Sequence, residues 1–123
     1  MLLDTNVLIY HLKNSLTAEF TEQLALTIVA QQGYISVITR IEMLAWKGHT
    51  ALSLQQTSGL IAQLPELGIN EAVITQTIHV RKVHGLKLPD AVIAATALVH
   101  GLQLVTANVV DFQRVERLAM QEI

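Results

Sequence analysis

The sequence predicts a single α/β domain over residues 1–123, in which helices cover both faces of a central, mainly parallel sheet of about five strands. Short apolar runs of strand length alternate along the chain with longer segments of helical periodicity. Strands that alternate with helices pair in parallel and are covered on both faces. The chain has enough residues for one core and too few for two, and no linker or repeat divides it.

The first half of the chain opens on a short buried strand over residues 1–4. Thr5 or Asn6 then caps a helix that runs to residue 12. Apolar residues at steps of four predict a second helix over 16–28, which Gly33 ends. A strand over 34–36 follows, and helices are expected from 37 toward Gly48 and over 51–64.

The second half repeats the alternation of strands and helices. A short strand near 67–69 follows Pro65, and Asn70 caps a helix that runs to residue 84. Pro89 suits the first turn of a helix over 88–100, which Gly101 ends; this helix is apolar on nearly all sides, so we expect it to be buried. A strand over 102–105, a helical turn over 111–115 and a strand over 118–123 complete the prediction.

The composition limits the classes of protein that the chain can form. Hydrophobic residues make up 51% of the chain and charged residues 15%, so a folded domain with much exposed apolar surface is expected, and such surface indicates a partner. The absence of cysteine excludes disulfides and thiolate metal sites. The sequence shows no signal peptide and no apolar run long enough for a membrane span, so we expect a cytoplasmic protein.

Four acidic residues stand where a sheet of this kind binds its ligands. Asp4 and Asp111 follow predicted strands, Glu42 is expected to be half-buried beside the apolar face of its helix, and Asp90 lies in the first turn of the most apolar helix. Each has a simpler explanation: stabilisation by a helix dipole for Asp4 and Asp90, a helix cap for Asp111, and pairing with Arg40 or a surface position for Glu42.

A shared position for these four acids would require a cation. Carboxylates packed together repel one another strongly, and a divalent ion offsets that repulsion. Ligands that are all oxygen favour Mg²⁺ or Mn²⁺ over Zn²⁺. Four of the ten acidic residues in one site would leave six against eight basic residues elsewhere, so the net charge of −2 neither supports nor excludes RNA binding. Sequence order alone does not show that the four converge.

Four segments resemble the ordered motifs of PIN domains. They are residues 3–9 (LDTNVLI), 35–44 (ISVITRIEML), 88–97 (LPDAVIAATA) and 104–112 (LVTANVVDF). They span nearly the whole chain in the family's order, and the length is similar to that of VapC toxins of toxin–antitoxin pairs. The resemblance implies a metal-dependent endoribonuclease that hydrolyses single-stranded or loop RNA, forms a homodimer and binds a cognate antitoxin protein.

The resemblance also implies roles for particular residues. Asp4, Glu42 and Asp90 would form the acidic core of a Mg²⁺ or Mn²⁺ site, with either Asn108 or Asp111 completing it. Further polar side chains would hydrogen-bond to these carboxylates and orient them: Thr5, Asn6, Thr39, Thr106 and Asn108. Arg40 is the one basic residue that we expect to contact RNA, and Trp46 is expected in the core or a dimer interface.

Two other interpretations remain open at this point. The chain could be a catalytically silent PIN-fold module that binds a protein partner, although the retained acids count against this. A receiver-type signalling domain also places aspartates at strand ends, but it needs an aspartate after its third strand, and residues 67–70 offer none. No glycine-rich phosphate loop and no nucleophile elbow is present.

Overall fold

The computed structural model describes all residues, 1–123. Strands β1 (Leu2–Leu3), β4 (Leu104–Thr106) and β5 (Met120–Glu122) form one parallel sheet in the order β1-β4-β5, and β2 (Ile35–Ser36) pairs in parallel with β3 (Glu66–Leu67). A parallel bridge between Leu2 and Tyr34 joins the two groups, giving the order β3-β2-β1-β4-β5. The α/β class and the mainly parallel sheet are therefore confirmed, although each strand is only two or three residues long.

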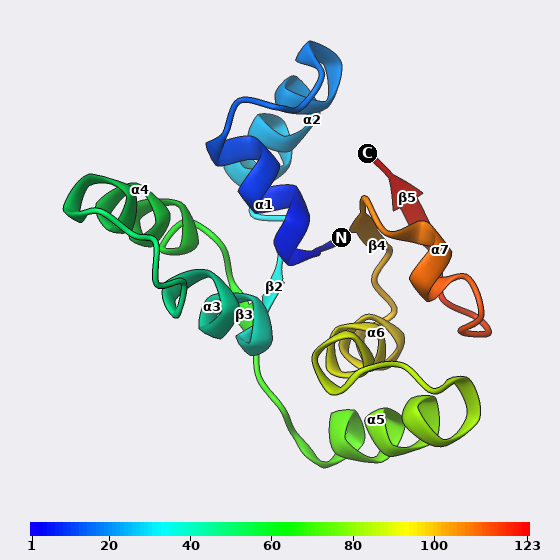
Figure 1. The fold of residues 1–123 in the computed structure, drawn as a ribbon. Coiled ribbons are helices and arrows are strands. Elements are labelled where there is room, and N and C mark those ends of the chain that lie inside the picture. Colours follow the sequence, from blue (N-terminus) through cyan, green and yellow to red (C-terminus); the bar gives the residue numbers. More distant parts are fainter.

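Alternation along the strands divides the core into two layers. Leu3, Ile35 and Val105 face a cluster built with α1 (Thr5–Leu12), α2 (Ala18–Val29), α3 (Val37–Leu44) and α4 (Ala51–Ile61). Leu2 and Leu104 face the opposite cluster, built with α5 (Glu71–His84), α6 (Leu88–His100) and α7 (Val109–Phe112). Successive strand residues point to opposite faces, so the short strands serve both layers. Figure 1 shows the strands between the two groups of helices.

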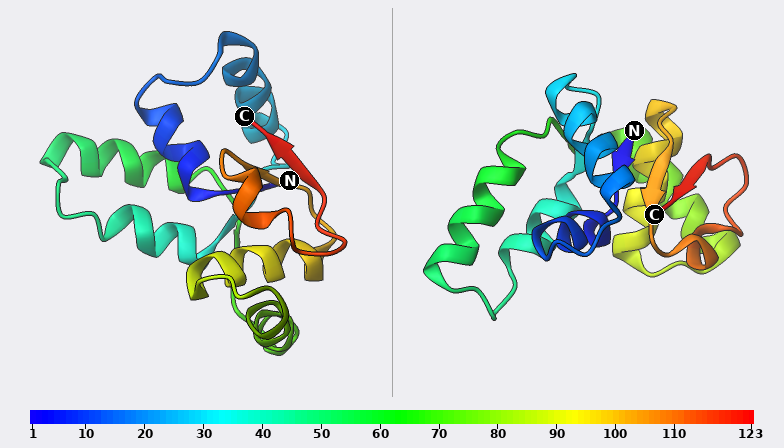
Figure 2. Two further views of the ribbon diagram at one scale, coloured as in Figure 1. Left: turned by 45° about the vertical axis from the view of Figure 1, so that its right-hand side comes forward. Right: turned by 90° about the horizontal axis from the view of Figure 1, so that it is seen from above.

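Helix α6 is the most buried helix, as the sequence predicts. Every residue from 91 to 97 is buried, because the sheet covers one side of the helix and α5 the other. The two views in Figure 2 show α5 lying outside α6 at one end of the molecule. Both helices end at a glycine in the left-handed conformation, Gly85 and Gly101, where a side chain would strain the backbone. No helix combines the length and the hydrophobicity that crossing a membrane requires.

Several predicted boundaries in the first half are wrong. The cap of α1 is Asp4, not Thr5 or Asn6. Helix α2 begins at Ala18 and ends before Gly33, because Gln31 takes the left-handed conformation and a backbone bond from Gln32 to Thr27 closes the last turn. Helix α4 ends at Ile61, and β3 begins one residue earlier than predicted.

Side chains that cap the backbone explain two further differences. Helix α3 stops at Leu44, well before Gly48, because the His49 ring donates to the carbonyl of Met43 at 2.7 Å. Helix α7 begins at Val109, two residues earlier than predicted, directly after the peptide N–H of Asn108 bonds to the Thr106 hydroxyl at 2.9 Å. Strand β4 begins and ends later than the predicted range 102–105, and β5 is shorter than the predicted range 118–123.

Candidate active site

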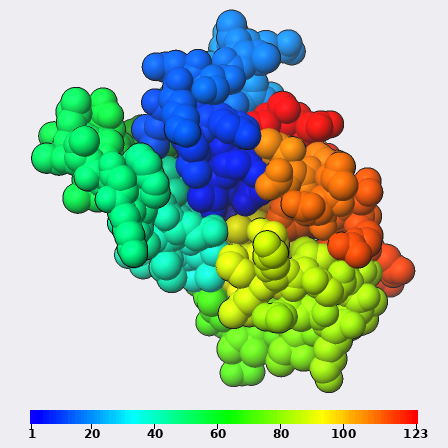
Figure 3. All heavy atoms as spheres, viewed as in Figure 1, coloured from blue at the N-terminus to red at the C-terminus, as the bar shows by residue number.

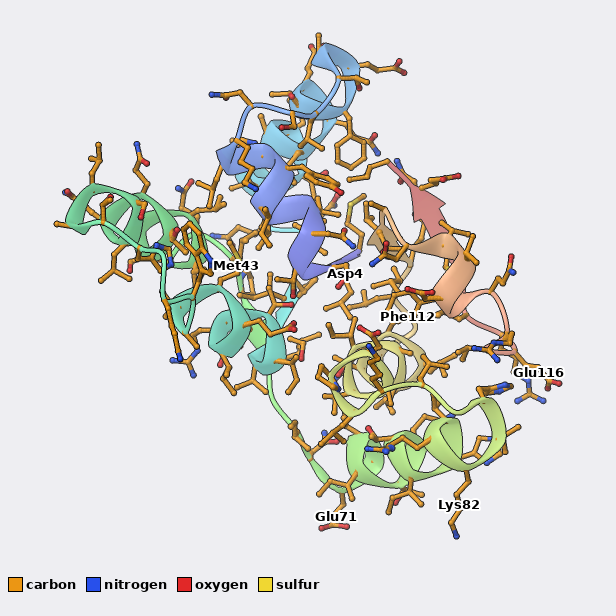
Figure 4. The ribbon with its side chains drawn as sticks, in the orientation of Figure 1. Asp4, Met43, Glu71, Lys82, Phe112 and Glu116 are labelled. Carbon is orange, nitrogen blue, oxygen red and sulfur yellow. The ribbon has the colours of Figure 1, made fainter.

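Asp4 is a buried carboxylate at the point where β1 ends and α1 begins, near the centre of the molecule (Figure 4). Only 4% of the residue is exposed. Its Oδ1 accepts from the backbone N–H of Thr5 at 2.8 Å, and its Oδ2 accepts from the Thr106 hydroxyl at 2.7 Å and the Asn6 amide at 3.1 Å. Three donors therefore fix the orientation of one carboxylate.

Asn6 and Thr106 tie the end of β1 to the end of β4. The Asn6 side-chain oxygen accepts from the backbone N–H of Ala107 at 3.1 Å, while its nitrogen donates to Asp4. Thr106 is fully buried; it donates to Asp4 and accepts from the N–H of Asn108. Because the carboxyl ends of parallel strands meet at one edge of a sheet, these loops face each other beside Asp4.

Glu42 reaches the same edge from α3. The residue is exposed, so the expectation of a half-buried side chain is wrong; it lies on the outer side of a helix whose inner side carries the buried Thr39 and Met43. Its Oε1 accepts from the Thr5 hydroxyl at 2.8 Å, and the Thr5 and Thr39 hydroxyls lie 3.0 Å apart. Arg40, the other suggested partner, pairs instead with Glu66 at 3.0 Å.

The pKa values of two aspartates show that the acids interact. Burial raises the pKa of Asp4; its hydrogen bonds act in the opposite direction, and the negative charge of Glu42 raises it further. Burial also raises the pKa of Asp90, followed by the charges of Asp4 and Asp111, while Lys87 partly offsets them. The neighbouring negative charges are therefore Glu42 for Asp4, and Asp4 and Asp111 for Asp90.

The donor chemistry of this acidic cluster fits Mg²⁺ or Mn²⁺. Every candidate ligand is an oxygen, and burial, followed by neighbouring carboxylates, raises the pKa values of Asp4 and Asp90; a cation would offset the charge repulsion. No group of three or more acidic or histidine side chains is already arranged around an ion position. Mg²⁺ commonly binds through one or two carboxylates and keeps several waters, so a site with few direct protein ligands would still suit it.

The two candidates for the fourth position differ in their surroundings. Both Asn108 and Asp111 are exposed. Asn108 makes its bond to Thr106 through its backbone, and its side chain caps no helix. The charge of Asp111 is felt by Asp90, which favours Asp111 as the fourth acid.

A groove lies beside Glu42 and is lined by residues of three helices. It has a volume of about 540 Å³ and lies between α1, α3 and α4. Figure 3 shows the α3–α4 pair flanking α1 on the left of the molecule. Trp46, expected in the core or a dimer interface, is 60% exposed and lines this groove together with Thr5 and Glu42. Nothing in the sequence signals that Trp46 is exposed.

The family model described as PIN domain matches residues 1–118, and the chain therefore belongs to the PIN domain family. Each of the four sequence motifs contains one of the candidate acids: Asp4, Glu42, Asp90 and Asp111. A comparison with curated proteins gives no match.

Solved structures similar to the chain come from toxin–antitoxin complexes. A toxin–antitoxin complex from Klebsiella pneumoniae is 32% identical, with 99% of this chain and 98% of that chain covered and a TM-score of 0.76. A DNA-bound VapBC from Salmonella typhimurium is 25% identical, with 98% and 96% covered and a TM-score of 0.82. VapBC2 from Rickettsia felis, bound to a promoter DNA fragment, shares the fold at 18% identity, 99% and 97% coverage and a TM-score of 0.86.

Proposed function

We propose that this chain is a metal-dependent endoribonuclease and the toxin of a toxin–antitoxin pair. The observation that carries the proposal is the buried Asp4 carboxylate at the carboxyl edge of the sheet, which three donors hold and which Thr5 links to the carboxylate of Glu42. PIN domains are generally nucleases that use divalent metal ions, and the solved structures similar to this chain include toxin–antitoxin complexes. RNA is the proposed substrate because an unstacked single strand can bring its backbone into an open acidic site.

The proposed site divides the chemistry among its residues. Asp4 and Asp90 would hold a Mg²⁺ or Mn²⁺ ion, with Glu42 and Asp111 completing its surroundings through oxygen atoms or water. The ion would supply a Lewis acid for the phosphate and for the attacking water. One of the exposed carboxylates accepts the proton of the water. Thr5, Asn6 and Thr106 keep Asp4 and Glu42 in place by the hydrogen bonds described above.

We also propose two protein partners. The antitoxin occupies the groove between α1, α3 and α4, where Trp46 offers apolar surface, and an arginine of the antitoxin reaches the carboxylates. A second copy of the chain covers exposed apolar residues close to the acids in sequence: Ile41, Leu88 and Val110. Arg40 remains a candidate RNA contact, although its guanidinium group is already paired with Glu66.

Cleavage of single-stranded RNA by the parent and by Asp4→Asn and Asp90→Asn, each with Mn²⁺ and with EDTA, tests the proposal. We expect activity in the parent only, and only with the ion. Glu71→Gln is the matched control, since Glu71 is an exposed acid at the start of α5, away from Asp4 (Figure 4). Equal cleavage by the parent and the Asp4 variant would refute the assignment. A parent that binds no Mn²⁺ would favour a silent interaction module instead.

A further inference from the structure

Thr39 differs from other buried threonines of the helices in its hydrogen-bond partner. Three buried threonines donate to the carbonyl four residues earlier in their own helix, at 2.7 to 2.8 Å: Thr27, Thr77 and Thr96. Thr39 is fully buried in α3, yet its hydroxyl contacts the Thr5 hydroxyl of α1 at 3.0 Å. Its hydroxyl is therefore used between helices, whereas those three threonines return theirs to the backbone.

The direction of this contact follows from the number of protons. A threonine hydroxyl has one proton to donate, and that of Thr5 goes to Oε1 of Glu42 at 2.8 Å. In the 3.0 Å contact Thr39 must then be the donor and Thr5 the acceptor. The three side chains form a directed chain of hydrogen bonds that starts in the core at Thr39 and ends at the exposed carboxylate of Glu42.

Glu42 depends on this chain for its position. It is exposed, it makes no salt bridge, and the bond from Thr5 is the only hydrogen bond to its carboxylate. The proton from Thr39 occupies an acceptor site of Thr5 and so directs the Thr5 proton toward Glu42. Successive hydrogen bonds also polarise one another, which strengthens the last bond of the chain.

We propose that Thr39 is a positioning residue for Glu42 and acts through Thr5. The inference rests on the proposed function, because a fixed Glu42 matters only if this carboxylate belongs to the metal site. It assigns the buried hydroxyl a part in ion binding although Thr39 lies too deep to contact the ion or the RNA. Removing the hydroxyl without changing the side chain's shape should release Glu42 while leaving the core filled.

Mn²⁺ affinity measured by calorimetry on the full chain tests this role. We expect Thr39→Val to weaken Mn²⁺ binding about 3- to 10-fold, less than the 10- to 100-fold typical of groups that contact a ligand directly. Thr39→Ser keeps the hydroxyl and should stay within about twofold of the parent. Thr77→Val removes a buried hydroxyl elsewhere and is the matched control, expected to leave the affinity unchanged. Thr39→Ala replaces the valine variant if that variant does not fold.

A double-mutant cycle with Glu42→Ala separates positioning from a general structural effect. If Thr39 acts through Glu42, Thr39→Val should have no further effect on Mn²⁺ affinity once Glu42 is alanine. Equal weakening in both backgrounds, or an unchanged affinity in Thr39→Val alone, would overturn the inference. If the parent binds Mn²⁺ and cleaves RNA, and Thr39→Val binds Mn²⁺ equally well, only the role of Thr39 is refuted. A parent that does neither refutes the proposed function, and the role of Thr39 with it.

Discussion

Replacing Thr106 by valine removes the shortest hydrogen bond to the buried Asp4 carboxylate while nearly preserving the shape of the side chain. The bond is 2.7 Å long and both residues are almost fully buried. A hydrogen bond to a charged group contributes about 1.5–3 kcal/mol to stability. The N–H of Asn108 also loses its acceptor, but it lies close enough to the surface to bond water instead. We therefore expect Thr106→Val to lower the free energy of unfolding by roughly 2–3 kcal/mol.

Thr96→Val is the matched control for this prediction. Thr96 is also fully buried, and it donates at the same 2.7 Å, but to the neutral carbonyl of Val92. A neutral bond contributes about 0.5–1.5 kcal/mol, so the Thr106 variant should be the less stable of the two by about 1 kcal/mol or more. Urea denaturation of the metal-free proteins, followed by circular dichroism, measures this difference.

The difference should depend on pH in a defined direction. The Thr106 bond favours the ionised form of Asp4 and so lowers its pKa, against the raising effect of burial. Its loss raises the pKa of Asp4 further, and this costs stability as the pH rises and Asp4 ionises. The gap between the two variants should therefore widen from acidic to neutral pH. If Thr106→Val is no less stable than Thr96→Val at any pH, the reasoning is wrong.

Three further predictions concern the acids and the backbone. The pKa of Asp90 is raised in the folded state, so the folded protein loses stability as the pH rises above the ordinary pKa of an aspartate and Asp90 ionises. Without metal at neutral pH, Asp90→Asn should therefore melt at a higher temperature than the parent. This difference should shrink as the pH is lowered. Mn²⁺ at about 100 times its dissociation constant should stabilise the parent by about 2.7 kcal/mol but leave Asp4→Asn unchanged, as thermal melts can show. Gly101→Ala should lower the free energy of unfolding by about 1 kcal/mol, because the φ of Gly101 is +63°. Gly59→Ala, inside α4, should raise it by a similar amount. Urea titrations that rank the two variants in the opposite order would contradict these predictions.

Local signals in the sequence predicted the elements and most of their order. Helix α6 was placed at its observed bounds because Pro89 and Gly101 mark its ends and its apolar composition marks its burial. Helix α2 ends where Gln31 takes the left-handed conformation, and α3 ends where a side chain from beyond the helix, that of His49, bonds to its last turn. Such a contact is formed only after the chain turns back on itself, so periodicity and propensity do not reveal it.

The four ordered motifs were enough to indicate the PIN domain family by resemblance, which the family model confirms, and each of them supplies one candidate acid. Tertiary structure alone decided how those acids are held. It buried Asp4 beneath three donors, left Glu42 exposed with a single bond from Thr5, and placed Asp111 within electrostatic reach of Asp90. Burial, hydrogen-bond direction and charge repulsion depend on distances between residues remote in sequence, and only the folded chain sets those distances.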